Sequence, residues 1–481
     1  MGRTSALVVS LATAAVLTAS GLVTSPAGSR DHGSAALQDA APEAPYVPYA
    51  PATARGDAAG VAAGVSGTAG VSGISGAAGH WVNTWTSMPQ PTEPGNMPPK
   101  PFTRPGMVFA DSTVRQTVHV STGGRRLRLR FSNAFGGAAL PLTAVRVALP
   151  AGGRAGSGAL QPGTTRKVTF GGHLSTAVPV GAQTVSDPLD LELRPGSDLT
   201  VTLYLADGQA SDAITSHPGS RTTSHMARGN HVDAPDLSGS ATTAHWYFLS
   251  GVEVWSKPAT AAAVVVGDSL TDGRGSTTDG NDRWPDQLLT RLRSRPETSQ
   301  VAVLNQAAGG NRVLNDGLGP NALARFDRDV LAQSGVRWLI LFEGVNDIGN
   351  AGATVTAQRQ MAEDLIAAYG QFVVRAHAQG IPVYGATLTP FGGNAGYDDP
   401  NGYREAARQT VNRWIRASGR FDAVIDFDRA ARDPEQPGRL RESFDLGDHL
   451  HLNPAGYKAL ADAVPAGLFT PRQPALDYGP R

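Results

Sequence analysis

The chain has 481 residues, more than the roughly 100–200 residues of an ordinary domain, so we expect two folded units. Its 41 Lys and Arg residues balance its 41 Asp and Glu residues, and it contains no cysteine. Because neither charge is in excess or forms long runs, nothing indicates a nucleic-acid partner or an anionic membrane surface. The lack of cysteine excludes disulfides, thiol catalysis and cysteine-ligated metal sites.

The N-terminus has the pattern of a secretory signal peptide. Arg3 is followed by an apolar stretch over residues 6–19 and by small residues up to Pro26 and Ala27. We therefore expect residues 1–27 to be a signal peptide and the protein to be secreted. The apolar stretch is shorter than the roughly 20 residues of a membrane span, so no stable membrane span is expected.

Two further segments are predicted to lie outside the folded domains. Residues 28–79 consist mainly of Ala, Gly, Pro and Ser, a composition that cannot bury a core and is typical of a disordered linker. Residues 472–481 are assigned to a C-terminal tail.

Residues 80–257 have the pattern of short β-strands. Apolar residues alternate with polar ones over residues 114–120, 127–131 and 199–205, and Gly, Pro and Asp clusters separate these runs. Alternation with frequent turns is typical of antiparallel sheets whose one face is buried. The first domain is therefore predicted to be an antiparallel β-sandwich or jelly roll.

Residues 258–471 show a different pattern, in which short apolar runs alternate with helical periodicity. The continuous apolar runs cover residues 261–266, 301–304, 338–342, 383–386 and 424–425. Helical periodicity is found over residues 284–292, 323–331, 357–377 and 405–415, and a last helix is expected from N-cap Asn453 and Pro454 to about Leu468. Buried strands that alternate with helices predict an α/β fold with a parallel sheet covered on both faces.

Residues able to carry chemistry follow these predicted strands. Ligands of such sheets bind beyond the carboxyl ends of the strands. The segments found there are Gly267-Asp268-Ser269-Leu270, Asn305 to Asn311 with the pair Gly309-Gly310, Gly344-Val345-Asn346-Asp347, and, before the last helix, Asp445 to His451. A serine, a glycine N–H, an amide and an Asp/His pair are therefore expected at one edge of the sheet.

This set of groups is sufficient for acyl transfer. A serine hydroxyl becomes nucleophilic when a histidine takes its proton, and the histidine needs a carboxylate that orients it. The tetrahedral intermediate also needs hydrogen-bond donors, and the N–H groups of Ser269 and Gly310 with the side chain of Asn346 can form such an oxyanion hole.

At these four segments the chain resembles the SGNH (GDSL-type) hydrolase family, whose conserved blocks supply Ser, Gly, Asn and His in this order. The resemblance implies a flavodoxin-like αβα sandwich, no metal or other cofactor, and Asp448 and His451 as partners of Ser269. Residues 80–257 resemble the β-rich N-terminal domain of some secreted actinobacterial-type members.

Alternatives remain at the level of single residues. His449 competes with His451 and Asp445 with Asp448, although the spacing of three residues between Asp448 and His451 matches the family. Five residues are predicted to contact substrate or to support the site: Asp268, Asp347, Thr389, Phe391 and His449. His217, His225 and His231 have irregular spacing, which favours solvated loop residues over a metal site.

The sequence thus predicts a secreted, monomeric serine esterase that acts on small-molecule or carbohydrate esters, with a short acyl group and no nucleic-acid partner. A lipase or phospholipase of the same family is the alternative within the enzyme class. A non-catalytic polysaccharide-binding protein is the alternative outside it.

Overall fold

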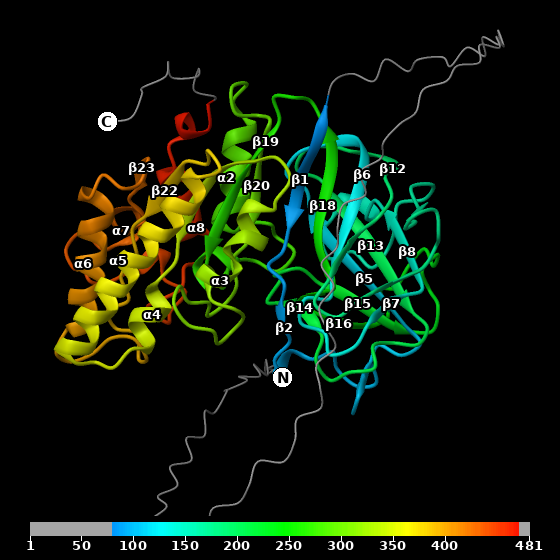
Figure 1. The fold of residues 1–481 in the computed structure, drawn as a ribbon, viewed down its shortest axis with the longest axis horizontal. Coiled ribbons are helices and arrows are strands. Elements are labelled where there is room, and N and C mark those ends of the chain that lie inside the picture. Colours follow the sequence, from blue (N-terminus) through cyan, green and yellow to red (C-terminus); the bar gives the residue numbers. More distant parts are fainter. Residues whose placement is uncertain (1–78, 471–481) are drawn as a thin grey trace, which may run out of the picture. The chain divides into compact units, whose positions relative to one another are not determined.

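The computed structural model describes residues 79–470, and the predicted signal peptide, nearly all of the linker and the predicted tail lie outside them. The described residues belong to one compact unit. Within it, antiparallel strands form a β-rich region up to Ser256, and parallel strands alternate with helices from Ala261 onwards (Figure 1). The predicted domain borders stay predictions.

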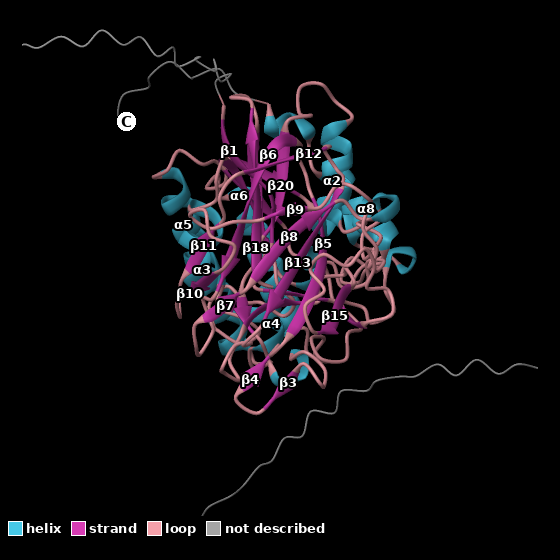
Figure 2. Ribbon diagram, turned by 90° about the vertical axis from the view of Figure 1, so that its right-hand side faces the viewer, coloured by secondary structure: helices cyan, strands magenta, loops and turns pink. Residues whose placement is uncertain are grey.

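The β-rich region contains two main antiparallel sheets. The first comprises, in spatial order, β1 (His80–Thr86), β18 (Leu249–Ser256), β6 (Gly124–Ser132) and β11 (Gln183–Val185), and β12 (Leu189–Leu193) also pairs with β6. The second comprises β16 (Ala241–Thr243), β15 (Ser224–Arg228), β5 (Ser112–His119), β13 (Asp198–Leu205), β8 (Ala144–Ala148) and β9 (Arg166–Lys167). Figure 2 shows β5, β13 and β8 running side by side.

Smaller elements complete this region. A third sheet is formed by β17 (His245–Tyr247), β14 (Thr215–Pro218) and β2 (Gln90–Pro91). Two antiparallel pairs are β10 (Thr176–Val178) with β7 (Leu140–Leu142) and β3 (Thr103–Arg104) with β4 (Met107–Val108). Two 3₁₀ turns are η1 (Pro94–Asn96) and η2 (Ala151–Gly153).

Alternating side chains of the two main sheets share one core. On β6, Leu127, Leu129 and Phe131 are fully buried while Arg128 and Arg130 between them are partly exposed. The buried face of β6 belongs to the same hydrophobic cluster as apolar side chains of β5, β8 and β13. The predicted antiparallel, sandwich-like architecture is confirmed.

The second region has a five-stranded parallel sheet in the order β20 (Val301–Asn305), β19 (Ala261–Gly267), β21 (Val336–Phe342), β22 (Val383–Ala386) and β23 (Ala423–Ile425). This is the flavodoxin-like order 2-1-3-4-5, as predicted. Every residue of β19 and β22 is buried, which explains why these strands read as continuous apolar runs. The strand order reverses around β19, and ligands of such sheets bind at this switch point.

The helices connect and cover this sheet. In chain order they are α1 (Ser269–Asp272), α2 (Trp284–Arg293), α3 (Ala322–Phe326), the π-helical turn η3 (Asp327–Leu331), α4 (Val345–Asn350), α5 (Val355–His377), α6 (Tyr403–Ala417), α7 (Phe427–Ala431), the 3₁₀ turn η4 (Glu442–Phe444) and α8 (Pro454–Ala463). Because the strand order reverses, right-handed crossovers place α2 on the opposite face from α5 and α6. Within residues 79–470, no helix has both the length and the apolarity to cross a membrane.

The last helix is shorter than the sequence predicts. Asn453 caps α8 as expected, and its side chain accepts hydrogen bonds from the N–H groups of Ala455 and Gly456. The helix ends at Ala463 instead of near Leu468, because Val464 precedes Pro465 and a residue before proline disfavours the helical conformation. A 3₁₀ turn, η5 (Ala466–Phe469), follows.

Candidate active site

Ser269 lies in a tight turn between β19 and α1. The turn requires glycine at position 267, since a Cβ there would lie 2.4 Å from the hydroxyl oxygen of Thr271 and 2.8 Å from the carbonyl oxygen of Phe342. Asp268 caps α1 by accepting a hydrogen bond from the N–H of Leu270 at 2.9 Å. Ser269 is thereby the first residue of the helix, at the carboxyl edge of the sheet.

The structure brings Ser269, His451 and Asp448 into one hydrogen-bonded chain. Ser269 Oγ lies 2.8 Å from His451 Nε2. His451 Nδ1 lies 2.6 Å from Asp448 Oδ2, and Asp448 Oδ1 accepts from the N–H of His451 at 2.8 Å. Burial opposes ionisation of Asp448, but the hydrogen bonds from the side chain and backbone of His451 prevail and hold the pKa of Asp448 well below its ordinary value. Asp448 is therefore a carboxylate at neutral pH.

His449 and Asp445 form a separate pair. His449 Nδ1 lies 2.6 Å from Asp445 Oδ2, and the side chain of His449 is half exposed. The backbone φ of His449 is +61°, a conformation that turns the chain between the two histidines. Of the two histidines, only His451 contacts Ser269.

The candidate oxyanion donors border the same cleft as Ser269 and His451. Gly310 has φ +72°, and a Cβ there would lie 2.4 Å from the side chain of Leu318, so both backbone and space favour glycine. Asn346 Nδ2 donates to the carbonyl of Asn311 at 2.8 Å, and its Oδ1 accepts from the hydroxyl of Tyr397 at 2.7 Å. These two bonds fix the orientation of the amide and leave its second N–H for a ligand.

Two buried carboxyl groups, those of Asp268 and Asp347, lie next to the site residues in the chain. Burial raises the pKa of Asp268 to about 7 and that of Asp347 to about 6. The carboxyl of Asp347 accepts from the N–H groups of Val313 and Leu314 at 2.9 and 3.0 Å. It thus connects α4, which carries Asn346, to the loop that follows Gly310.

Most of the predicted substrate contacts are not on the cleft surface. Asp268, Asp347, Thr389 and Phe391 are at most 2% exposed, and none of them lines the cleft. His449 is exposed but also lies off the cleft wall. Substrate contact by these residues stays a prediction. The hydrogen bonds of Asp268 and Asp347 instead hold the segments that carry Ser269 and Asn346.

The cleft has a volume of about 350 Å³ and is lined by both regions of the chain. From the parallel-sheet region its lining residues include Ser269, Asp272, Arg274, Gly309, Gly310, Leu318, Asn346, Tyr397, Leu450 and His451. From the β-rich region they are Gln90, Glu93, Asn96, Pro218, Gly219, Arg221 and His245. No local pattern in the sequence predicts this second wall, because it depends on packing between segments far apart in the chain.

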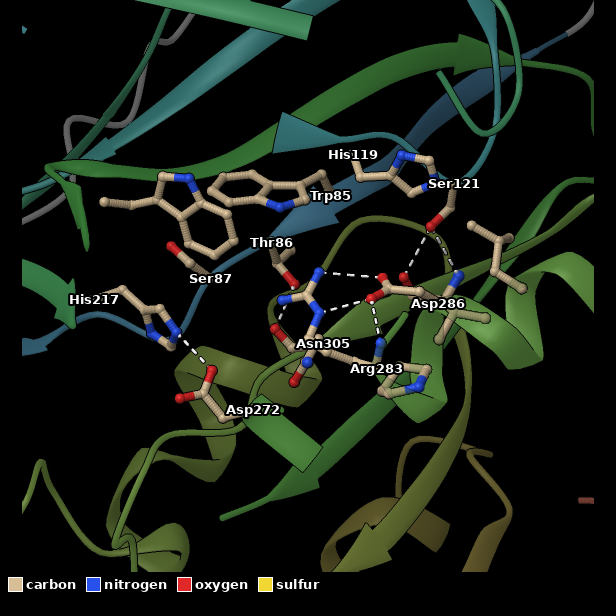
Figure 3. Close-up of a pocket in the computed structure, with 14 residues that line it drawn as sticks. Trp85, Thr86, Ser87, His119, Ser121, His217, Asp272, Arg283, Asp286 and Asn305 are labelled. Atoms are coloured by element: carbon tan, nitrogen blue, oxygen red, sulfur yellow. Dashed lines mark hydrogen bonds and ion pairs between the residues drawn. The ribbon is translucent and has the colours of Figure 1, made fainter. Parts of the chain in front are cut away.

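One buried contact joins the β-rich region directly to the helix of Ser269. His217 on β14 is 3% exposed, and its Nε2 lies 2.9 Å from Asp272 Oδ1 at the end of α1 (Figure 3). Its Nδ1 donates to the carbonyl of Met88 at 3.0 Å. A water-sized cavity of about 20 Å³ lies beside this pair, and Arg283 and the strand residue Trp85 are among the residues around it (Figure 3).

The expectation that the three histidines lie in solvated loops is wrong for two of them. His217 and His225 lie in strands β14 and β15, in each of which three successive residues, the histidine included, are buried. His225 Nε2 lies 2.9 Å from the carbonyl of Gly156, and exposed His231 bonds the carbonyl of Arg228. In the part of the chain that the structure describes, no three His, Asp or Glu side chains are grouped as metal ligands would be.

Residues 265–459 match the model of the GDSL-like lipase/acylhydrolase family, while a search of curated protein sequences found no match. Among solved structures, a variant of an acetyl xylan esterase from Geobacillus stearothermophilus is 22% identical, with 43% of this chain and 94% of that chain covered and a TM-score of 0.33. A GDSL-like lipase from Bacteroides thetaiotaomicron VPI-5482 is 15% identical, with 42% and 84% covered and a TM-score of 0.31.

The family match spans all four segments in which the sequence placed its candidate residues, from Ser269 to His451. Together with the parallel sheet in the order 2-1-3-4-5, it confirms the resemblance. Residues 265–459 form a GDSL-like lipase/acylhydrolase domain, and the chain is a carboxylic ester hydrolase.

Proposed function

We propose that the chain hydrolyses carboxylic esters through an acyl-enzyme formed on Ser269. The observation that carries this proposal is the chain of hydrogen bonds from Ser269 Oγ to His451 Nε2, at 2.8 Å, and from His451 Nδ1 to Asp448, at 2.6 Å. A hydroxyl, an imidazole and a carboxylate in this order constitute the machinery of nucleophilic acyl transfer.

In the first half-reaction, Ser269 Oγ attacks the ester carbonyl carbon while its proton moves to His451 Nε2. The carbonyl oxygen becomes an oxyanion, which accepts hydrogen bonds from the N–H groups of Ser269 and Gly310 and from the amide of Asn346. The bond between the carbonyl carbon and the alcohol oxygen then breaks, and His451 returns the proton to the departing alcohol. Asp448 keeps the imidazole oriented and stabilises its charged form.

In the second half-reaction, water takes the place of the alcohol. His451 removes a proton from water, whose oxygen attacks the acyl carbon and forms a second oxyanion in the same position. The bond to Ser269 Oγ breaks, Ser269 regains its proton from His451, and the carboxylic acid leaves. Asp448 and His451 end in their starting protonation states.

We further propose short acyl or acyl-carbohydrate esters as substrates. The wall that faces Ser269 carries polar side chains, among them Gln90, Asn96 and His245. These groups suit the hydroxyls of a polar alcohol better than a long alkyl chain, whose burial needs apolar surface. Activity on esters of two, four, eight and twelve carbons should decline with length; a rise beyond about eight carbons would favour the lipase alternative.

The catalytic proposal is tested with 4-nitrophenyl acetate. We expect Ser269→Ala to lose about 10⁴-fold or more in kcat, whereas Ser299→Ala, which changes a serine outside the cleft, should keep wild-type activity. A fluorophosphonate probe should label the wild type and not Ser269→Ala. Failure to label the wild type would favour a polysaccharide-binding protein, since only an activated serine reacts.

Export is also proposed, on the basis of Arg3 and the apolar stretch over residues 6–19. Expression of the full chain in a secreting bacterium, followed by N-terminal sequencing of the protein in the medium, tests it. The proposal predicts a mature N-terminus near residue 28, and retention of the uncleaved chain in the cells would contradict it. We expect the secreted protein to be a monomer, which light scattering can measure.

A further inference from the structure

Arg221, in the wall opposite Ser269, forms no ion pair with any described residue. It lines the cleft from the β-rich region, and among the described residues no side chain or carbonyl accepts a hydrogen bond from its guanidinium. The two carboxylates of the same cleft each bond other side chains, Asp272 through Oδ1 only. Glu93 accepts from Gln90 Nε2 and Asn96 Nδ2, each at 2.9 Å, and Asp272 is bonded to His217.

The loop that carries Arg221 is held rigidly in a strained conformation. Arg221 has φ +55°, a region that residues with a Cβ enter only when the surroundings enforce it. Asp279 of the parallel-sheet region enforces it here. The N–H of Asp279 donates to the carbonyl of Arg221 at 2.9 Å, and its carboxylate accepts from the N–H and hydroxyl of Thr223 at 2.7 and 2.8 Å.

Glycine keeps the space between Arg221 and the helix of Ser269 open. Gly219 has φ +73°, and a Cβ there would lie 3.8 Å from Arg221 Nη2 and 3.6 Å from Asp272 Oδ2. A side chain at this position would therefore extend between the guanidinium and α1. Because glycine adds no such bulk, a ligand group can reach Arg221 from the position of the ester.

A second arginine lies on the other wall of the cleft. Arg274 follows α1, its side chain is 58% exposed, and its Nε lies 4.0 Å from Asp448 Oδ2. The hydroxyl of Tyr457 donates to the carbonyl of Arg274 at 2.5 Å and fixes its backbone. Arg221 and Arg274 thus line the same cleft from its two walls.

We propose that Arg221, assisted by Arg274, forms an anion subsite beside Ser269 and selects esters that also carry a carboxylate. The proposal rests on the esterase function proposed above and specifies its substrate class. A guanidinium binds a carboxylate through two parallel hydrogen bonds, and Arg221 has no competing partner. The carboxylate can belong to the acyl part, as in a dicarboxylic half-ester, or to the alcohol part, as in an acetylated uronic acid.

Two matched pairs of esters test the subsite and separate these sources. For the acyl part, 4-nitrophenyl hydrogen glutarate is compared with 4-nitrophenyl pentanoate, which has the same number of acyl carbons. For the alcohol part, acetate release from acetylated glucuronic acid is compared with that from acetylated glucose. We expect the wild type to prefer the charged member of at least one pair in kcat/KM about tenfold, and the preference to shrink as ionic strength rises.

Variants assign the preference to Arg221. Arg221→Gln should reduce the ratio of charged to neutral kcat/KM about tenfold, whereas Arg126→Gln, which removes an exposed arginine outside the cleft, should keep the wild-type ratio. Equal kcat/KM of the wild type on both members of both pairs would overturn the subsite while the esterase proposal stands. So would a wild-type ratio in Arg221→Gln. Undiminished hydrolysis by Ser269→Ala would instead overturn the esterase proposal.

Discussion

His217 in strand β14 is hydrogen-bonded to Asp272, the last residue of the helix that begins with Ser269, at 2.9 Å. The two side chains are 4% and 5% exposed. Nδ1 of His217 faces the carbonyl oxygen of Met88, so both ring nitrogens have a partner. The β-rich region thus holds the nucleophile helix through a buried hydrogen bond between side chains.

Breaking this pair should lower both stability and activity. In His217→Ala, the buried carboxyl group of Asp272 loses its hydrogen-bond partner, which should lower the free energy of unfolding by about 1–3 kcal/mol. We also expect kcat to fall, because α1 is no longer held. Urea unfolding and 4-nitrophenyl acetate kinetics measure the two effects, and His231→Ala is the control at an exposed histidine.

A double-mutant cycle isolates the contact itself. If His217 acts through Asp272, the losses in His217→Ala and Asp272→Ala should not add in the double variant. Strictly additive losses would show that the two side chains act independently and would refute the interpretation.

The two Asp/His pairs near the last helix should differ in their effect on catalysis. Asp448→Asn leaves the shape of the site but removes the carboxylate that holds His451, so kcat should fall by about 10⁴-fold. Asp445→Asn changes the pair that does not contact Ser269 and should alter kcat less than about threefold. Initial rates with 4-nitrophenyl acetate decide the matter; comparable losses in both variants would contradict the assignment of Asp448.

The reactive residues could be predicted because their signals are local. Gly267 and Ser269 directly follow a continuous apolar run, and the spacing of Asp448 and His451 lets one turn join them. The strands of the parallel sheet could also be predicted from a local pattern, because burial on both faces requires an uninterrupted apolar run. Helices α4 and α7 were missed because segments of five or six residues are too short to show helical periodicity.

The opposite wall of the cleft could not be predicted. Arg221 and His245 acquire their role only when β14 and β17 pair and pack against the parallel-sheet region, and no spacing in the sequence encodes that contact. The burial of His217 has the same origin. Its partner Asp272 lies 55 residues away, so the irregular spacing of the histidines favours solvated loops where the fold provides a buried acceptor.

Asn346 and Tyr397 should act as a unit. Asn346→Ala removes a donor to the oxyanion and should lower kcat by about 10²–10³-fold with a smaller change in KM. Tyr397→Phe removes only the hydroxyl that holds the Asn346 amide at 2.7 Å, so a smaller loss is expected. In the double variant the Tyr397 effect should vanish; an undiminished effect of Tyr397→Phe in the Asn346→Ala background would show that Tyr397 acts by another route.

Glu343, at the end of β21, should make the protein less stable as pH rises. Burial raises its pKa from the ordinary 4.5 to about 8, although Arg325 at 3.4 Å opposes the shift. Below pH 4.5 the folded and unfolded chains both hold the proton. Between there and pH 8 the folded chain keeps a proton that the unfolded chain releases, so the free energy of unfolding falls with rising pH.

Glu343→Gln should therefore flatten this part of the stability profile. Glutamine keeps the shape of the side chain but has no proton to retain, so urea unfolding between pH 5 and pH 8 should show a smaller decline than the wild type. Asp268 and Asp347 have raised pKa values of the same sign, so part of the slope should remain. Glu363→Gln, at an exposed position of α5, should reproduce the wild-type slope. An unchanged slope in Glu343→Gln would mean that Glu343 is already ionised in the folded protein, with Arg325 compensating for its burial.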